Sequence, residues 1–294
     1  MKKKKVVAIV SCPRSGSTLL ELVLCAHSKC FGIGEAYLLF DPAKNRFDEV
    51  DQTRCTCNQI ISECEFWKQF IIQLRSSGEE SVYSKYSLLL DHCKNNTQVD
   101  SVIIDSSKLL RSLEYWEKMP DIDLRVLFLV KDVRSWTVSQ QDSYRRSNQY
   151  DFFQLLRKRG LFAIPSYLRR TSIANYIYWY WKNRRYSKFI SEHKIPSIIV
   201  KYEDICLESK KTILRICDFI GFDFEKNMLD LENATSHNIF GNRMRFQSDK
   251  CKKISYDYRW FYKNDWLIPS LLLPLITRYN KRLYGRKISE KWEK

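Results

Sequence analysis

A short run near the N-terminus, residues 13–18 (P-R-S-G-S-T), has the residue types of an anion-binding loop. Gly16 permits close backbone approach, and Arg14 supplies a permanent cation with a planar fork of donors. A helix that begins after such a loop points backbone N–H groups and a positive dipole at an anion. The candidate binding residues are Arg14, Ser15, Gly16, Ser17 and Thr18. The alternative is an ordinary strand-to-helix turn with a capping serine.

Regular elements are predicted on both sides of this loop. Residues 5–11 form a short β-branched apolar run, and residues 18–26 place leucine and valine at helical spacing. Three further apolar runs, at residues 102–105, 124–130 and 198–202, each end in polar residues before a helical stretch. Continuous apolar strands alternating with helices indicate a parallel sheet covered on both faces. Ligands on such sheets bind at the carboxyl ends of the strands, where these polar residues fall.

We therefore expect an α/β chain with a P-loop-like three-layer fold, in which a central parallel sheet is flanked by helices. No internal repeat or low-complexity linker interrupts the 294 residues, so we expect one domain over residues 1–294. The anion-binding loop lacks the G-x-x-x-x-G-K-[ST] spacing of a Walker A motif. This weighs against a magnesium-dependent kinase or ATPase, which stays as an alternative with a degenerate loop.

Two segments carry a resemblance to a known family. The run C-P-R-S-G-S-T-L-L resembles the 5′-phosphosulfate loop of sulfotransferases that use 3′-phosphoadenosine 5′-phosphosulfate (PAPS). It is closest to the carbohydrate and protein-tyrosine branch and its bacterial relatives, where arginine replaces lysine in the loop. The run V-L-F-L-V-K-D-V-R-S-W-T-V-S is similar to the family's 3′-phosphate segment, with Lys131 and Ser139 at the binding positions. The family usually has arginine where Lys131 stands, so the charge is kept but the bidentate fork is lost; Arg134 lies between the two positions.

Two later segments extend the resemblance in the same order. K-Y-E-D-I, which contains Tyr202, resembles a Y-E-D-L motif that lies beside the adenine. H-N-I-F-G-N-R-M-R-F is similar to a C-terminal G-N-P-x-R-F segment that closes over the cofactor. In this segment Asn242 and Arg245 match the family, while Arg243 replaces its proline. The four matches span residues 6–246, most of the chain.

The resemblance implies transfer of a sulfuryl group from PAPS to an acceptor hydroxyl, with 3′,5′-adenosine bisphosphate (PAP) as the other product. The transfer is an in-line displacement, and because sulfate carries less charge than a terminal phosphate we expect no metal requirement. We expect Arg14 to stabilise the leaving phosphate oxygen and Lys108, in D-S-S-K, to reach the sulfuryl group. Glu35, in F-G-I-G-E, is the expected general base.

Each catalytic role has a structural alternative. Lys108 is also placed for a surface lysine at a helix start, and Glu35 for a carboxylate that caps a helix or forms a salt bridge. His27 and His237 are the alternative bases, since histidine titrates near neutral pH. Packing or capping is the favoured interpretation for both histidines.

A cysteine cluster is the remaining candidate for metal chemistry. Among ten cysteines, Cys55, Cys57 and Cys64 lie within C-T-C-N-Q-I-I-S-E-C. A structural zinc site uses four cysteine or histidine ligands, and Cys30 is a candidate for the fourth. Because nothing in the sequence requires that fourth ligand, we favour reduced structural thiols and expect no metal site.

The chain carries a formal charge of +16, which attracts polyanions. A nucleic-acid-binding protein is an alternative function, supported by the basic and aromatic stretch 144–185. An anionic cofactor explains the same charge, so we expect no nucleic acid partner. The charge favours a carbohydrate or anionic acceptor, with a pocket shaped by residues 41–98 and 145–176.

Cellular location is predicted from what the termini contain. The apolar run after the N-terminal lysines covers only residues 6–10, which is short for a secretory signal, and no run of 18 apolar residues occurs. We therefore expect a cytoplasmic protein. Residues 267–287 join an apolar run to a basic tail, as membrane-surface anchors do. Packing against the core is the favoured interpretation of that segment, with weak membrane-surface contact as the alternative.

Overall fold

The structure is a computed structural model that describes residues 3–76, 78, 81–146, 157, 168, 170–231, 236–241, 246 and 253–285. Within these residues five strands form one sheet in the order β2-β3-β1-β4-β5, and every neighbouring pair is parallel. The strands are β1 (Lys4–Ser11), β2 (Cys30–Gly34), β3 (Val102–Asp105), β4 (Ile122–Val130) and β5 (Ser197–Lys201).

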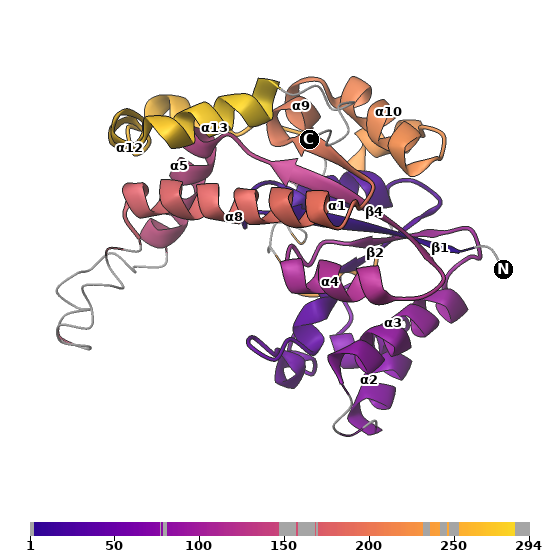
Figure 1. Cartoon of the computed structure of the whole chain (residues 1–294). Helices are drawn as coiled ribbons and strands as arrows, with labels where there is room; N and C mark the ends of the chain where they lie inside the picture. The colour runs from indigo at the N-terminus through magenta and orange to yellow at the C-terminus, as the bar shows by residue number, and fades with distance from the viewer. Residues whose placement is uncertain are drawn as a thin grey trace.

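Helices connect the strands and cover both faces of the sheet (Figure 1). Those in the first half of the chain are α1 (Ser17–Cys25), α2 (Trp67–Ser76), α3 (Val82–Asn96), α4 (Leu110–Lys118) and α5 (Val133–Arg146). Those in the second half are α8 (Ser172–Glu192), α9 (Tyr202–Leu207), α10 (Ser209–Ile220), α12 (Leu267–Leu272) and α13 (Pro274–Gly285). Figure 1 shows α2 and α3 at one end of the molecule, below the sheet, and α12 and α13 at the opposite end.

The central strand β1 shows how the layers form. Its side chains alternate between the faces because successive residues of a strand point in opposite directions. Val7 and Ile9 pack in a core with residues of α1, α9 and α10. Val6 packs with residues of α2, α3 and α4, whereas Ala8 and Val10 pack with residues of α4, α5, α8 and α13. The predicted three-layer fold with a parallel sheet is therefore confirmed.

The predicted strands agree with the structure to within two residues at each end. Strand β2 was missed, since its sequence C-F-G-I-G offers only two large apolar residues and two glycines. Much of the segment 145–176, which was expected to shape an acceptor pocket, lies outside the described residues; α8 begins at Ser172.

The expectation that the C-terminal helices pack against the core is met fully by only one of them. In α13, Ile276 and Leu283 are buried and confirm it. In and beside α12 it holds only in part, since Pro269 is buried and Leu273 packs against the core, while several large apolar side chains are exposed: Leu267, Ile268, Leu271, Leu272 and Leu275. No helix among the described residues is both long and apolar enough to cross a membrane.

A close backbone contact fixes the end of β2. Gly34 has φ +66° and forms a parallel bridge with Ile239, whose carbonyl accepts a hydrogen bond of 2.9 Å from the Glu35 N–H. A Cβ on Gly34 would lie 2.4 Å from the Ile239 carbonyl oxygen and 2.5 Å from its nitrogen. Only glycine therefore fits at this position, both for its backbone conformation and for the space around it.

We predict that Gly34→Ala lowers the free energy of unfolding by about 3 kcal/mol or more, because left-handed strain and a backbone clash add. Gly78→Ala is the matched control: Gly78 has φ +64°, and a Cβ there would meet nothing within 4 Å. The free energy of unfolding of this control should fall by only about 1 kcal/mol. Urea unfolding of both variants measures the difference, and equal losses would contradict the close contact.

Candidate functional site

The parallel sheet places the predicted site residues in one row along its carboxyl edge. Each follows a different strand, and the order along the edge is that of the strands: Glu35 after β2, Lys108 after β3, the loop 13–18 after β1, Lys131 after β4 and Tyr202 after β5. At about 4.8 Å between strands, the row extends over about 19 Å. The edge is thus long enough for an extended ligand.

The anion-binding loop packs directly on the Tyr202 ring. Gly16 precedes α1 with φ +95°, and a Cβ there would lie 2.5 Å from the Tyr202 Cδ2 atom. The Ser15 side chain is fully buried, and its hydroxyl has no hydrogen-bond partner among the described residues. A buried hydroxyl without a partner is costly, so the loop contains a polar group that a bound anion would satisfy.

Arg14 links this loop to α5. Its Nε donates to the Ser139 carbonyl oxygen over 3.0 Å, and its Nη1 donates to the Ser143 hydroxyl over 3.0 Å. Burial lowers the pKa of Arg14 from its ordinary value, and the nearby Arg146 and Arg259 lower it further. The loop 13–18 and helix α5 are predicted to bind different phosphates of one nucleotide, and these contacts bring them together. The cations around Arg14 are partly desolvated, and such a cluster attracts an anion.

Lys131 and Tyr202 also lie together, as the sequence predicts. The Lys131 side chain is buried, with its Nζ atom 4.4 Å from the centre of the Tyr202 ring. Burial lowers the pKa of Lys131, while the charge of Asp257, whose carboxylate is 3.5 Å away, opposes that shift. Because an unpaired buried ammonium is unstable, the Lys131 side chain requires an acidic partner here.

Asp257 belongs to a charged network that sequence reasoning missed. Arg259 donates to the Asp257 carboxylate over 2.7 Å and to the Asp142 carboxylate of α5 over 2.8 Å. Although burial alone would raise it, the pKa of Asp257 is held well below its usual range by Arg259 and Lys131. The D-Y-R spacing of Asp257 and Arg259 was the one available signal, and it matches no functional motif.

A second ion pair occupies the other end of the row. The Lys108 Nζ atom lies 2.5 Å from the Glu35 Oε1 atom, and the two side chains are 14% and 17% exposed. The Lys108 backbone is held by a hydrogen bond from the Tyr186 hydroxyl to its carbonyl oxygen. Gly241 covers Glu35 closely, since a Cβ on Gly241 would lie 2.9 Å from Glu35 Oε1. A cation and a proton acceptor are therefore adjacent.

The two predicted catalytic cations share an unusual backbone conformation. Arg14 has φ +66° and Lys108 has φ +60°. A left-handed conformation costs a residue other than glycine about 1–3 kcal/mol and persists only where surrounding contacts impose it. Such strain often occurs at functional sites, but among the described residues Asn58, Asp121, Lys194 and Phe240 also have positive φ, so it does not by itself identify the site.

Glu21 is a buried carboxylate next to this site that the sequence did not reveal. It lies on α1, accepts hydrogen bonds from the Gly34 N–H over 3.0 Å and the Ser106 hydroxyl over 2.7 Å, and is 3% exposed. Burial raises its pKa to about 7. The signal for it was a single acidic residue within the apolar run L-L-E-L-V-L.

The alternative bases have other partners. The His27 Nε2 atom lies 2.8 Å from the Asp223 carbonyl oxygen, and its Nδ1 accepts a hydrogen bond of 3.0 Å from the Lys29 N–H. The His237 Nδ1 atom lies 3.1 Å from the Cys64 sulfur. These contacts favour structural roles for both. The predicted cofactor residues Asn242 and Arg245 lie outside the described residues.

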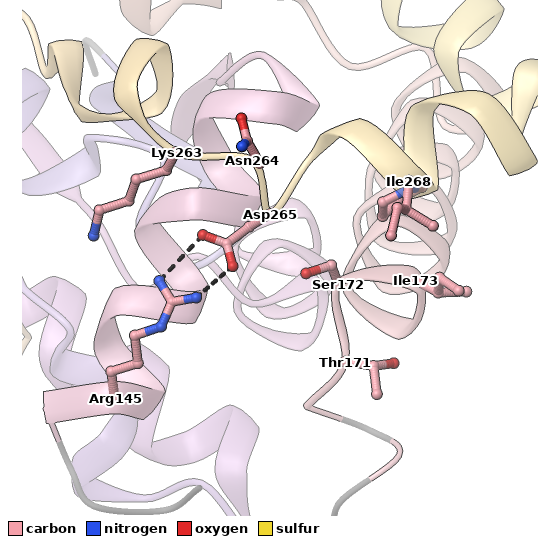
Figure 2. Close-up of a pocket in the computed structure, with 9 residues that line it drawn as sticks. Arg145, Thr171, Ser172, Ile173, Lys263, Asn264, Asp265 and Ile268 are labelled. Atoms are coloured by element: carbon pink, nitrogen blue, oxygen red, sulfur yellow. Dashed lines mark hydrogen bonds and ion pairs between the residues drawn. The ribbon is translucent and has the colours of Figure 1, made fainter.

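A separate pocket of about 540 Å³ lies beside α12. Figure 2 shows the Arg145 guanidinium facing the Asp265 carboxylate in its wall. The lining residues are Arg145, Thr171, Ser172, Ile173, Lys263, Asn264, Asp265, Ile268 and Pro269. None of the predicted catalytic or cofactor residues is among them. Four of the lining residues fall within the segment 145–176 that was expected to shape an acceptor pocket.

Comparison with known proteins identifies a family and several solved structures with a similar fold, among them two sulfotransferase domains. The family model described as the sulfotransferase family matches residues 7–226. The sulfotransferase domain of the Synechococcus PCC 7002 olefin synthase is 19% identical, with a TM-score of 0.53 over 98% of this chain and 97% of that one. The sulfotransferase domain of the curacin biosynthetic pathway is 18% identical, with a TM-score of 0.57 over 98% of this chain and 100% of that one. No curated protein matches the sequence.

The raised pKa of Glu21 predicts a pH-dependent stability. Its folded-state pKa of about 7 exceeds the ordinary value of 4.5, so the folded chain binds more protons than the unfolded chain between these values. Stability should therefore fall as pH rises from 4.5 to 7, by about 3 kcal/mol at most from this residue. Glu21→Gln should flatten the dependence, whereas exposed Glu192→Gln should not. Urea unfolding midpoints of the unmodified chain and both variants, measured from pH 4.5 to 7, give the pH dependence of stability. Identical slopes of midpoint against pH in all three proteins would disprove the raised pKa of Glu21.

Proposed function

This chain belongs to the sulfotransferase family, and we propose that it transfers the sulfuryl group of PAPS to an acceptor hydroxyl, releasing PAP. The observation that carries this proposal is the row of residues along the carboxyl edge of the sheet. The anion-binding loop lies at its centre, a buried lysine and an aromatic ring lie on one side, and a carboxylate–ammonium pair lies on the other. A nucleotide and an acceptor can therefore approach from opposite ends.

We assign the nucleotide to the half of the row formed by β1, β4 and β5. In this proposal the loop 13–18 holds the 5′-phosphosulfate, Lys131 and Ser139 hold the 3′-phosphate, and Tyr202 contacts the adenine. The contact of Arg14 with Ser139 and that of Lys131 with the Tyr202 ring support it. The Ser15 hydroxyl, for which the described part of the chain offers no hydrogen-bond partner, supplies a further donor for the phosphosulfate.

Binding of a 3′-phosphate has to overcome the carboxylate of Asp257, which lies 3.5 Å from the Lys131 ammonium. Two anions at one ammonium repel each other, so Lys131 is expected to exchange Asp257 for the phosphate. Asp257 keeps a partner after this exchange, since Arg259 donates to it over 2.7 Å. Before the nucleotide binds, Asp257 supplies the counter-charge of Lys131. After it binds, Asp257 is still paired with Arg259, so no carboxylate is left isolated.

The chemistry proposed for the other half of the row is an in-line displacement at sulfur. The acceptor oxygen forms a bond to sulfur while the bond from sulfur to the bridging phosphate oxygen breaks. Arg14 stabilises the negative charge that develops on that phosphate oxygen, and Lys108 neutralises the sulfuryl oxygens. Glu35 takes the proton that the acceptor hydroxyl loses. Because Lys108 pairs with Glu35 over 2.5 Å, the cation also holds the base in position.

The acceptor class follows from charge. A formal charge of +16 favours acceptors that carry anionic groups, and hydroxyl-rich carbohydrates that bear carboxylates or sulfates meet this description. We therefore propose a carbohydrate or a related hydroxylated metabolite as the acceptor.

Nucleotide titration tests the cofactor assignment. Calorimetry with PAP and with adenosine 5′-phosphate should show magnesium-independent binding of both, with PAP tighter. Arg14→Ala should weaken both ligands by about 10- to 100-fold, the worth of a charge-assisted hydrogen bond. Lys131→Ala should weaken the binding of PAP by a similar factor, because only PAP carries the 3′-phosphate. The affinity for adenosine 5′-phosphate should change by no more than about 3-fold.

Lys188→Ala is the control, since Lys188 is an exposed lysine of α8 that pairs with Glu192. It should bind both nucleotides as the unmodified chain does. Equal losses for both nucleotides in Lys131→Ala would remove Lys131 from the 3′-phosphate site. Binding of ATP with magnesium, and no binding of PAP, would favour a kinase over a sulfotransferase.

Substitution of the proposed base separates catalysis from binding. Glu35→Gln keeps the shape of the side chain but removes the proton acceptor, so we expect kcat to fall at least about 100-fold with PAP affinity unchanged. The measurement is transfer of radioactive sulfate from PAPS to the best acceptor in a panel of desulfated chondroitin, simple sugars and 4-nitrophenol. Unchanged kcat in Glu35→Gln would show that another group accepts the proton.

A further inference from the structure

Three cysteines and one histidine converge at the edge of the molecule that carries β2. Cys55, Cys57 and Cys64 lie in the segment before α2, and His237 lies more than 170 residues later in the chain. Their sulfur and Nδ1 atoms all lie within 4.8 Å of one another. Sequence reasoning identified the three thiols but sought the fourth ligand in Cys30, so His237 is the residue that completes the set.

The distances among these atoms are close to those of a tetrahedral zinc site. Zn–S bonds of about 2.3 Å and Zn–N bonds of about 2.0 Å place tetrahedral ligand atoms about 3.5–3.8 Å apart. The Cys57 and Cys64 sulfurs are 3.5 Å apart, and the His237 Nδ1 atom is 3.9 Å from the Cys55 sulfur and 3.1 Å from the Cys64 sulfur. We propose that these four residues bind one structural zinc ion.

The surroundings of His237 hold its ring in a ligand-binding orientation. The ring stacks on Phe66 at 5.6 Å and 26° and on Phe31 at 5.8 Å and 22°. The His237 carbonyl oxygen accepts a hydrogen bond of 2.5 Å from the Trp67 indole N–H. Metal sites depend on such outer contacts, because they fix the direction in which each ligand points.

The cysteine segment is shaped in a similar way. The Cys55 N–H donates to the Gln59 carbonyl oxygen and the Asn58 N–H donates to the Cys55 carbonyl oxygen, both over 2.9 Å. Asn58 has φ +68°, which closes a tight turn around Cys57. This turn brings the exposed Cys57 beside the buried Cys55 and Cys64.

Zinc explains the cluster better than a disulfide does. A bond between Cys57 and Cys64 would use two sulfurs and leave Cys55 and His237 without a role. Thiolate ligands with one imidazole in a tetrahedron are the set that zinc prefers over calcium or magnesium. With four protein ligands the ion has no open position, so its role is structural and separate from sulfuryl transfer.

The site ties together two segments that are far apart in sequence. The Thr56 N–H donates to the Asn238 carbonyl oxygen over 3.2 Å, and the Asn238 N–H donates to the Thr56 hydroxyl over 2.9 Å. From His237 the chain continues to Ile239, which pairs with Gly34, and to Gly241, which lies against Glu35. Zinc at His237 would therefore anchor the segment that covers Glu35.

Metal content tests the proposal without any assay of activity. The chain is purified with a tag that binds no metal, under reducing conditions, dialysed against zinc and then against metal-free buffer, and measured by mass spectrometry. We expect about one zinc per chain. Cobalt in place of zinc should give the thiolate-to-cobalt charge-transfer band and strong visible absorption of a tetrahedral site. Cys57→Ala, at the exposed position, and His237→Ala should each reduce bound zinc at least tenfold, whereas Cys206→Ala should keep it.

Two results would overturn the zinc site. The first is an unmodified chain that holds less than about a tenth of an equivalent of zinc after this treatment. The second is zinc content that is unchanged in both Cys57→Ala and His237→Ala, since the ion would then bind elsewhere. The unmodified chain decides the first result alone, so a variant that fails to fold leaves the test intact.

Discussion

The parallel direction of the strands is the constraint on which the rest of the structure depends. A parallel sheet brings the carboxyl ends of all its strands to one edge, whatever the distance between them along the chain. The loop after β1 and the residues after β2, β3, β4 and β5 become neighbours for this reason alone. Helices on both faces make the arrangement stable, because parallel strands need apolar cover on each side. The proposed site is therefore a consequence of the fold.

Charge along this edge is balanced locally by neighbouring side chains and backbone oxygens. Lys131 pairs with Asp257, Lys108 pairs with Glu35, and Arg14 donates to oxygen atoms of α5. Such pairing is expected, because a buried cation without a partner is strongly destabilising. In our account each of these partners also prepares the site: Asp257 gives way to a phosphate, and Glu35 is already beside the cation that neutralises the sulfuryl group.

The sequence was sufficient for the parts of the molecule that local pattern determines. Apolar runs predicted four of the five described strands, and residue types in the loop 13–18 predicted a turn before α1. Anion binding by that turn stays a prediction. Strand β2 was missed because its alternate glycines give no apolar pattern. Asp257 and Glu21 were missed, and His237 was considered only as a base and not as a partner of the cysteines, for a different reason: their contacts join residues far apart in the chain, and only the folded chain shows them.

The central claim is the direction in which the nucleotide lies along the edge, and a crystal structure with bound PAP tests it most directly. Our account predicts the 5′-phosphate in the loop 13–18, the 3′-phosphate beside Lys131 and Ser139, and the adenine near Tyr202. It also predicts that the Glu35–Lys108 pair stays open to an acceptor. A nucleotide bound with its adenine over β2 and β3, or outside this edge, would contradict the account.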